Sequence, residues 1–128
     1  GVVTLAGANT YRGGTTFTAG TLRLESLDAV GSVGNLTFQG GTLQYSASNT
    51  FDYGARIVNS TAAVSIDTGG QNVISTVALA ASNTGGFRKS GAGSYTFNAA
   101  HAYVGPTTVS GGTLNGVGSY NSQLVVEN

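Results

Sequence analysis

Residues 4–22 read T-L-A-G-A-N-T-Y-R-G-G-T-T-F-T-A-G-T-L, and residues 96–114 read T-F-N-A-A-H-A-Y-V-G-P-T-T-V-S-G-G-T-L. The second stretch aligns without a gap on the first when 92 is added to each residue number. Self-similarity at a fixed period is typical of repeat architectures, in which each unit contacts only its neighbours. The chain is therefore expected to form part of a rod or ring rather than a globule.

The composition favours strands. The chain has 128 residues, of which 21 are Gly and one is Pro, and only 8% are charged, against about 25% in an average domain. Helix formers such as Lys, Glu, Gln and Met are scarce, whereas Val, Thr, Tyr and Phe favour β-structure. We therefore expect one all-β domain, spanning residues 1–128, with a continuous core.

Charge and cysteine usage exclude several classes of partner. Five basic residues balance five acidic ones, so there is no basic stripe for nucleic acid. No apolar run approaches the roughly 20 residues of a membrane-spanning helix, and we expect no direct membrane insertion. The absence of Cys excludes disulfides and thiolate metal sites.

Short apolar runs separated by Gly, Asn, Ser and Asp fill the chain, and most of them alternate apolar with polar residues, which is typical of strands with one inward face. The expected strands are Val3–Leu5, Thr15–Phe17, Thr21–Leu24, Asn35–Phe38, Thr42–Tyr45, Arg56–Val58, Ala63–Ile66, Val73–Val77, Tyr95–Phe97, Thr107–Val109, Thr113–Leu114 and Gln123–Val126.

A shorter period lies beneath the long one. Gly20-Thr21-Leu22 recurs 21 residues later as Gly41-Thr42-Leu43, a spacing that suits one coil of a parallel β-solenoid. The 92-residue unit would then contain four or five coils. The alternative is a sandwich or an up-and-down barrel. The hairpin dipeptide Asp-Gly is absent and Asn-Gly occurs once, at residues 115–116, so tight hairpins have little support. We expect a β-solenoid with about 20–21 residues per coil.

The first copy, Leu5 to Leu22, resembles the passenger-associated transport repeat (autotransporter-associated β-strand repeat) of bacterial autotransporters. The family pattern runs roughly L-S-G-x-N-T-Y-T-G-G-T-T-V-x-x-G-T-L. The second copy departs from it at His101 and Pro106, and Gly86–Gly93 resembles the G-L-x-K-x-G-x-G lead-in to a new repeat. The motif positions carried over are Gly7, Asn9, Tyr11, Gly13, Gly14, Thr15, Thr16, Gly20, Thr21, Leu22, Tyr103, Gly105, Thr107, Thr108, Gly112, Thr113 and Leu114.

The resemblance implies a right-handed parallel β-helix within a longer secreted passenger of a type V secretion system. Such a passenger is displayed at the bacterial cell surface and anchored in the outer membrane through a C-terminal barrel of the parent. The repeats are implied to support export and to form a stalk or fibre, without catalysis. The alternative is an adhesin or self-association module. Expected partners are neighbouring repeats of the parent, further chains stacked end to end, and a glycan or host surface.

An enzyme is the third class considered, because glycosidases also use β-helices. Glycoside hydrolysis needs two carboxylates about 5–9.5 Å apart. Glu25 and Asp28 lie in a polar loop without aromatic or basic support, and Asp67 lies in an Asp-Thr-Gly-Gly turn where backbone capping explains it. We expect no catalytic residue, no cofactor and no metal site.

The remaining polar residues have structural interpretations. The Thr residues are expected in ladders, with Leu22, Leu43 and Leu114 stacked inside. Asn9 and Asn35 occupy positions where an amide caps a corner or forms a turn. His101 is expected at the surface or at a corner.

Two further features are interpreted as corners. Tyr11 and Tyr103 are expected to pack at equivalent corners with their hydroxyls reaching solvent. Arg88-Lys89 is interpreted as a solvated corner.

Overall fold

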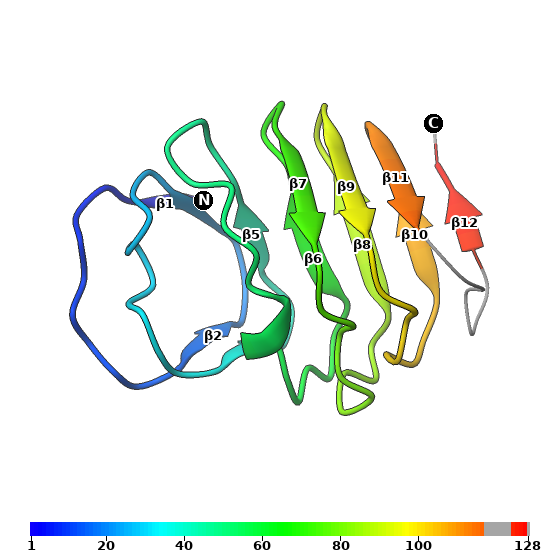
Figure 1. Cartoon of the computed structure of the whole chain (residues 1–128), viewed down its shortest axis with the longest axis horizontal. Coiled ribbons are helices and arrows are strands. Elements are labelled where there is room, and N and C mark those ends of the chain that lie inside the picture. The colour runs from blue at the N-terminus through cyan, green and yellow to red at the C-terminus, as the bar shows by residue number, and fades with distance from the viewer. Residues whose placement is uncertain (117–123, 128) are drawn as a thin grey trace.

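The chain is a stack of parallel β-coils. The computed structural model describes residues 1–116 and 124–127, and its strands run side by side along the long axis from the wide N-terminal coils to β12 (Figure 1). Every strand pair is parallel, so each coil adds one rung beside the previous one. The expected all-β parallel solenoid is confirmed.

The strands are short, three or four residues each. They are β1 (Val2–Leu5), β2 (Thr15–Phe17), β3 (Thr21–Leu24), β4 (Leu36–Phe38), β5 (Thr42–Gln44), β6 (Val64–Asp67), β7 (Asn72–Ser75), β8 (Phe87–Ser90), β9 (Ser94–Phe97), β10 (Thr107–Val109), β11 (Thr113–Gly116) and β12 (Leu124–Val126). A 3₁₀ turn, η1 (Gly54–Arg56), interrupts them. No helix in the described part of the chain is long and apolar enough to cross a membrane.

Three parallel sheets form the faces. The main sheet has the order β1-β3-β5-β6-β8-β10-β12, the second has β11-β9-β7, and the third pairs β2 with β4. In the main sheet Thr21 pairs with Thr42, and Thr42 pairs with Ser65. These steps of 21 and 23 residues agree with the expected coil of about 21.

The 92-residue repeat is not a whole number of coils. Register partners carry Val2 through Thr21, Thr42 and Ser65 to Arg88, so four coils take 86 residues. The repeat partner of Val2 is Ser94, which lies in β9 of the second sheet. The expected four or five coils are therefore four coils and one additional face.

The change of face occurs between β5 and β6. Before it, β2 and β4 form the third sheet while β3 and β5 lie in the main sheet; after it, β6, β8 and β10 lie in the main sheet and their successors form the second. The expected strand Arg56–Val58 falls in this connection and was wrong. Its chain instead turns as η1, with the Arg56 amide donating to the Tyr53 carbonyl, and only Ile57 bridges to Leu36.

The core follows the inner rows of the sheets. In the main sheet Leu22, Leu43, Ile66, Lys89 and Val109 are successive register partners. Leu114 is not part of this row, because it pairs with Tyr95 in the second sheet. Phe17 and Phe38 stack in parallel on the third sheet with ring centroids 4.4 Å apart. Each fully buried Leu, Ile or Phe contributes about 1.5–3 kcal/mol through the hydrophobic effect.

Candidate functional site

The repeat motif builds the same hydrogen bond in both of its copies. The Tyr11 hydroxyl lies 2.8 Å from Thr15 Oγ1, and the Tyr103 hydroxyl bonds Thr107 Oγ1 in the same way. The expectation that these hydroxyls reach solvent was wrong for Tyr103, whose bond is buried, whereas the bond of Tyr11 lies at the surface. Their surroundings differ, since Tyr11 is exposed whereas Tyr103 is buried.

A left-handed glycine separates the two strands of each copy. Gly20 has φ of +71° and Gly112 has φ of +65°, a region that side chains with a Cβ rarely enter. A Cβ on Gly112 would lie 2.3 Å from the Gly93 carbonyl oxygen, and one on Gly20 would lie 2.9 Å from that of Gly1. Glycine is thus required at this corner by both conformation and space.

The other glycines of the motif have less uniform roles. A Cβ on Gly7 or Gly13 would meet nothing within 4 Å. Gly14 approaches the Asn35 carbonyl, whereas Pro106 replaces it in the second copy. Gly105 has φ of +105° and packs against Gly86. The corner glycine is therefore the one whose geometry the two copies share.

The threonines and leucines of the motif lie in strands, and the copies are far apart in the stack. Thr15 and Thr16 belong to β2, Thr21 and Leu22 to β3, Thr107 and Thr108 to β10, and Thr113 and Leu114 to β11. Figure 1 places the first group among the N-terminal coils and the second near β12. The structure does not gather the motif residues into one site.

Corner amides bind backbone groups of neighbouring coils. Asn9 Nδ2 donates to the Ala29 carbonyl at 2.6 Å, whereas the Asn35 side chain is exposed and its backbone carbonyl accepts from Thr15. Two fully buried amides that the sequence analysis did not predict also bind backbone carbonyls of other coils. Asn49 Nδ2 donates to the Ser26 carbonyl at 2.8 Å, and Asn83 Nδ2 donates to that of Ile57 at 3.0 Å.

Lys89 lies in an environment that its sequence context does not predict. It lies in β8, which was not expected as a strand, and its side chain is fully buried in the inner row. Its Nζ donates to the carbonyls of Ser90 (2.7 Å), Gly91 (2.7 Å) and Gly111 (3.0 Å). Burial lowers the pKa of Lys89, while the nearby charge of Asp67 opposes this. The expected solvated corner at Arg88-Lys89 is thus a strand with an internal cation.

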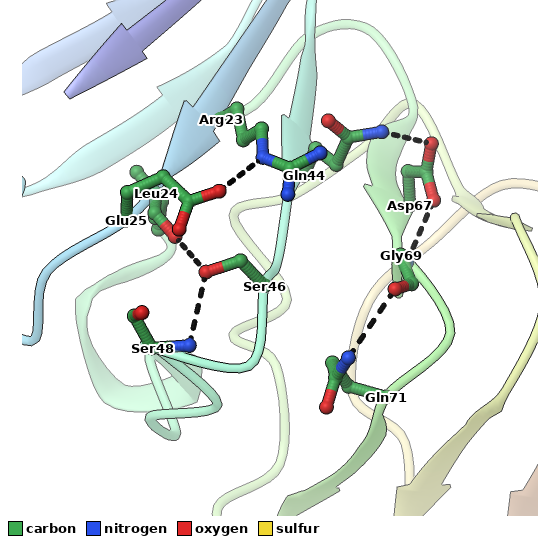
Figure 2. A network of polar contacts seen from close by, with 9 residues as sticks. All are labelled: Arg23, Leu24, Glu25, Gln44, Ser46, Ser48, Asp67, Gly69 and Gln71. Atoms are coloured by element: carbon green, nitrogen blue, oxygen red, sulfur yellow. Dashed lines mark hydrogen bonds and ion pairs between the residues drawn. The ribbon is translucent and has the colours of Figure 1, made fainter. Parts of the chain in front are cut away.

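The carboxylates take part in structural bonds. Figure 2 shows Glu25 paired with Arg23, and Asp67 accepting bonds from Gln44 Nε2 and from the Gly69 amide. The bond from Arg23 lowers the pKa of Glu25. Because Arg23, Gln44 and Asp67 are successive register partners, this network lies along three rungs of the main sheet.

Two further carboxylates have similar partners. Asp52 accepts bonds from the Gly54 amide and from both the amide and the hydroxyl of Thr76. Glu127 pairs with Arg88 at 3.1 Å. Within residues 1–116 and 124–127, no three His, Cys, Asp or Glu side chains cluster in a way that could hold a metal ion.

His101 lies in the core rather than at the surface. Its ring is buried, perpendicular to that of Phe97 at a centroid distance of 4.4 Å and 5.2 Å from that of Tyr103. Burial lowers the pKa of His101. Of the two expected positions, surface or corner, the surface one was wrong because the aromatic side chains of β9 and the following loop enclose this residue, which lies in the connection between β9 and β10.

The coils and their Tyr–Thr corners define a parallel β-solenoid repeat protein. The model of the passenger-associated-transport-repeat family matches residues 1–24 and 87–115, the segments that contain both copies of the motif and the lead-in with Lys89. The two segments that contain the motif copies are therefore passenger-associated transport repeats.

One relative extends the similarity beyond the motif. A protein of Brucella suis biovar 1 (strain 1330), named Adhesin BmaC autotransporter, is 36% identical over 128 aligned positions, which cover 89% of this chain. The chain spans 4% of that protein's length. No solved structure gives a significant match.

Proposed function

We propose that this chain is a structural, non-catalytic segment of an autotransporter-like passenger displayed at the bacterial cell surface, where it supports export and forms part of a stalk or fibre. The observation that carries the proposal is the corner geometry of the repeat. Tyr11 with Thr15, and Tyr103 with Thr107, make one bond in two different faces of the rod. A motif kept for chemistry would instead present its groups to a common site.

Folding energetics support a role in export. Each coil buries its inner row against the previous coil, so folding can propagate from one end of the chain once a nucleus has formed. Folding outside the cell would prevent return of the emerging chain and would bias its transit outward. The partners required are the neighbouring coils of the parent passenger. The C-terminal barrel of the parent would anchor that passenger in the outer membrane.

The export role is tested by display. The chain is fused to an autotransporter barrel, and its surface exposure is measured by external protease on intact cells. We expect Gly112→Ala, which strains a corner, to reduce exposure several-fold, while Gly7→Ala, whose Cβ meets nothing within 4 Å, leaves it unchanged. Equal display of both variants, with Gly112→Ala shown to be unfolded in purified form, would overturn the role in export.

The second candidate is an adhesive module. The relative from Brucella suis carries the word adhesin in its name, and this chain exposes an aromatic side chain, Phe51, on a connection between coils. Loss of binding to host cells or glycans upon mutation of this surface, with display unchanged, would support adhesion over a purely structural role.

A further inference from the structure

A surface pocket lies beside the connection in which the coils change face. It has a volume of about 320 Å³ and is lined by Leu27, Asp28, Gly31, Ser32, Phe51 and Tyr53. This size is at the lower end of the roughly 300–1,000 Å³ typical of small-molecule sites, which favours a single small ring over a long ligand.

Hydrogen bonds hold the Tyr53 ring and the Phe51 backbone in the aromatic wall of the pocket. Tyr53 is buried, and its hydroxyl accepts from Asn49 Nδ2 at 2.7 Å. Asn49 Oδ1 accepts from the Phe51 amide at 3.0 Å, and the Phe51 carbonyl accepts from the Tyr45 hydroxyl at 2.8 Å. The two rings are 5.1 Å apart and tilted by 54°. A wall fixed in this way loses little conformational entropy when a ligand binds.

Arg56 fixes the second part of the lining, the loop that carries Gly31 and Ser32. Its guanidinium group donates to the carbonyls of Val30, Gly31, Val33 and Gly34 at 2.7–3.0 Å. These bonds use a long side chain from the next coil to hold the loop that carries Gly31 and Ser32. Both walls are therefore formed before any ligand arrives.

The exposed groups combine an apolar face with a small polar set. Phe51 is 53% exposed and Leu27 is 62% exposed, and neither side chain belongs to the inner rows of the coils. The Asp28 carboxylate and the Ser32 hydroxyl make no hydrogen bond or ion pair among the described residues. An aromatic and aliphatic surface beside a carboxylate and a hydroxyl matches a pyranose, whose ring presents C–H groups on its face and hydroxyls at its rim.

A cationic ligand fits less well. The Arg56 guanidinium carbon lies 5.6 Å from the centre of the Tyr53 ring, so the attraction of this ring for a cation is already used. A second positive charge in the pocket would lie near the first, whereas a neutral sugar would not be repelled.

The position in the chain also points to binding. All six lining residues lie between residues 24 and 87, outside the two segments that match the transport repeat. Phe51 and Tyr53 lie in the connection from β5 to β6, where the regular succession of coils is interrupted, and the other four lie in the connection from β3 to β4. In solenoids, insertions between repeats commonly map to loops on the binding face.

We propose that the pocket of Leu27, Asp28, Ser32, Phe51 and Tyr53 binds one pyranose unit of a glycan, which stacks on Phe51 and Leu27 and donates hydroxyl hydrogen bonds to Asp28. This assignment rests on the adhesive alternative above and supplies its ligand class. It does not depend on the role in export, since binding is measured on the isolated chain.

The test uses the purified 128-residue chain. Saturation-transfer NMR and calorimetric titration are performed with methyl glycosides of glucose, galactose, mannose and N-acetylglucosamine, followed by a glycan array. We expect at least one pyranoside to bind, and Phe51→Ala to weaken it at least tenfold, which corresponds to about 1.4 kcal/mol. Asp28→Ala should weaken it as well, and Ser32→Phe, which fills the pocket while leaving Phe51 in place, should abolish binding.

The control is Ile74→Ala, which truncates an exposed apolar side chain on β7 outside the pocket and should bind like the unaltered chain. Unchanged binding by Phe51→Ala and Ser32→Phe, or no binding of any glycoside at millimolar concentration, overturns the proposal. Salt-sensitive binding of spermidine in place of sugars would also overturn it, in favour of a cation site. If the chain binds sugar but the displayed passenger does not promote cell attachment, the glycan site is confirmed and the adhesive role is refuted.

Discussion

At the residue scale, Lys89 is a fully buried cation in an otherwise apolar inner row. Its register partners in the inner row, Ile66 and Val109, are apolar, yet its ammonium group is saturated by three carbonyls. An ammonium group has three donors, so no donor is left without a bond. Because two of these carbonyls belong to Gly91 and Gly111, the side chain links the corners of successive coils.

Removing this side chain should destabilise the rod. Lys89→Ala leaves the corner carbonyls without their donor and opens a space in the inner row, for which we expect a loss of about 2–4 kcal/mol in the free energy of unfolding. Lys89→Met, which keeps the aliphatic stem, should lose less. The measurement is equilibrium unfolding in urea.

The neighbouring Arg88 supplies the control. It is partly exposed and pairs with Glu127 at 3.1 Å, so Arg88→Ala should cost no more than about 1 kcal/mol. Equal effects of Lys89→Ala and Arg88→Ala would contradict the internal role of Lys89.

At the element scale, the short corner between two strands is the unit that the sequence repeats. Gly20 joins β2 to β3 and Gly112 joins β10 to β11, both in the left-handed region. The first pair joins the third sheet to the main sheet, whereas the second pair joins the main sheet to the second sheet. The corner therefore keeps its shape because of local backbone geometry. The sheets that it joins depend on the strands and connections that precede it in the chain.

Substitution at this corner should be costly. Gly112→Ala places a Cβ 2.3 Å from the Gly93 carbonyl oxygen and forces an L-residue into a conformation that costs roughly 1–2 kcal/mol. We expect a total loss of more than about 2 kcal/mol in the free energy of unfolding, measured in urea.

Gly7→Ala is the matched control for this substitution. It removes backbone freedom from the unfolded chain and should change stability by less than about 1 kcal/mol, toward stabilisation where the backbone is unstrained. A Gly112→Ala variant as stable as Gly7→Ala would show that the corner tolerates a side chain.

At the scale of the whole molecule, the 128 residues taken by themselves leave one edge of the main sheet unpaired at β1. β1 is the edge strand of the main sheet, and its Val3, the register partner of Leu22, is 61% exposed. An edge strand with apolar side chains and unpaired backbone groups is a template for another strand. Val3 thus occupies the inner-row position that Leu43 and Ile66 occupy in later coils, where they are fully buried, but its own side chain is exposed.

This edge predicts that the 128-residue chain, purified by itself, associates end to end. We expect the mass of the particle to rise with concentration in sedimentation or light-scattering experiments, and Val3→Lys to suppress the rise by placing a charge at the edge. Val104→Lys, an exposed residue of a loop, should have no effect. A strict monomer at all concentrations would contradict the prediction.

Much of the fold could be predicted because it depends on local patterns. Alternation located β3 and β10 to the residue, and the 21-residue echo predicted the pairing of Thr21 with Thr42. β8 was missed because two cations and flanking glycines resemble a solvated loop, and no local pattern signals that a Lys will find three carbonyls. The buried amides of Asn49 and Asn83 were missed for the same reason, since their partners lie more than 20 residues away.

The amino-acid sequence by itself determined the class of structure, the coil length and the corner geometry. Alternation sets which side chains face inward, and positive φ at a corner requires glycine whatever the face. Only the tertiary structure decided the phase of the rod, in which 92 residues are four coils and one face, because the connection between β5 and β6 shifts all later strands. The same connection forms the pocket at Phe51 and Tyr53, since Asn49 and Arg56 reach across coils to hold its walls.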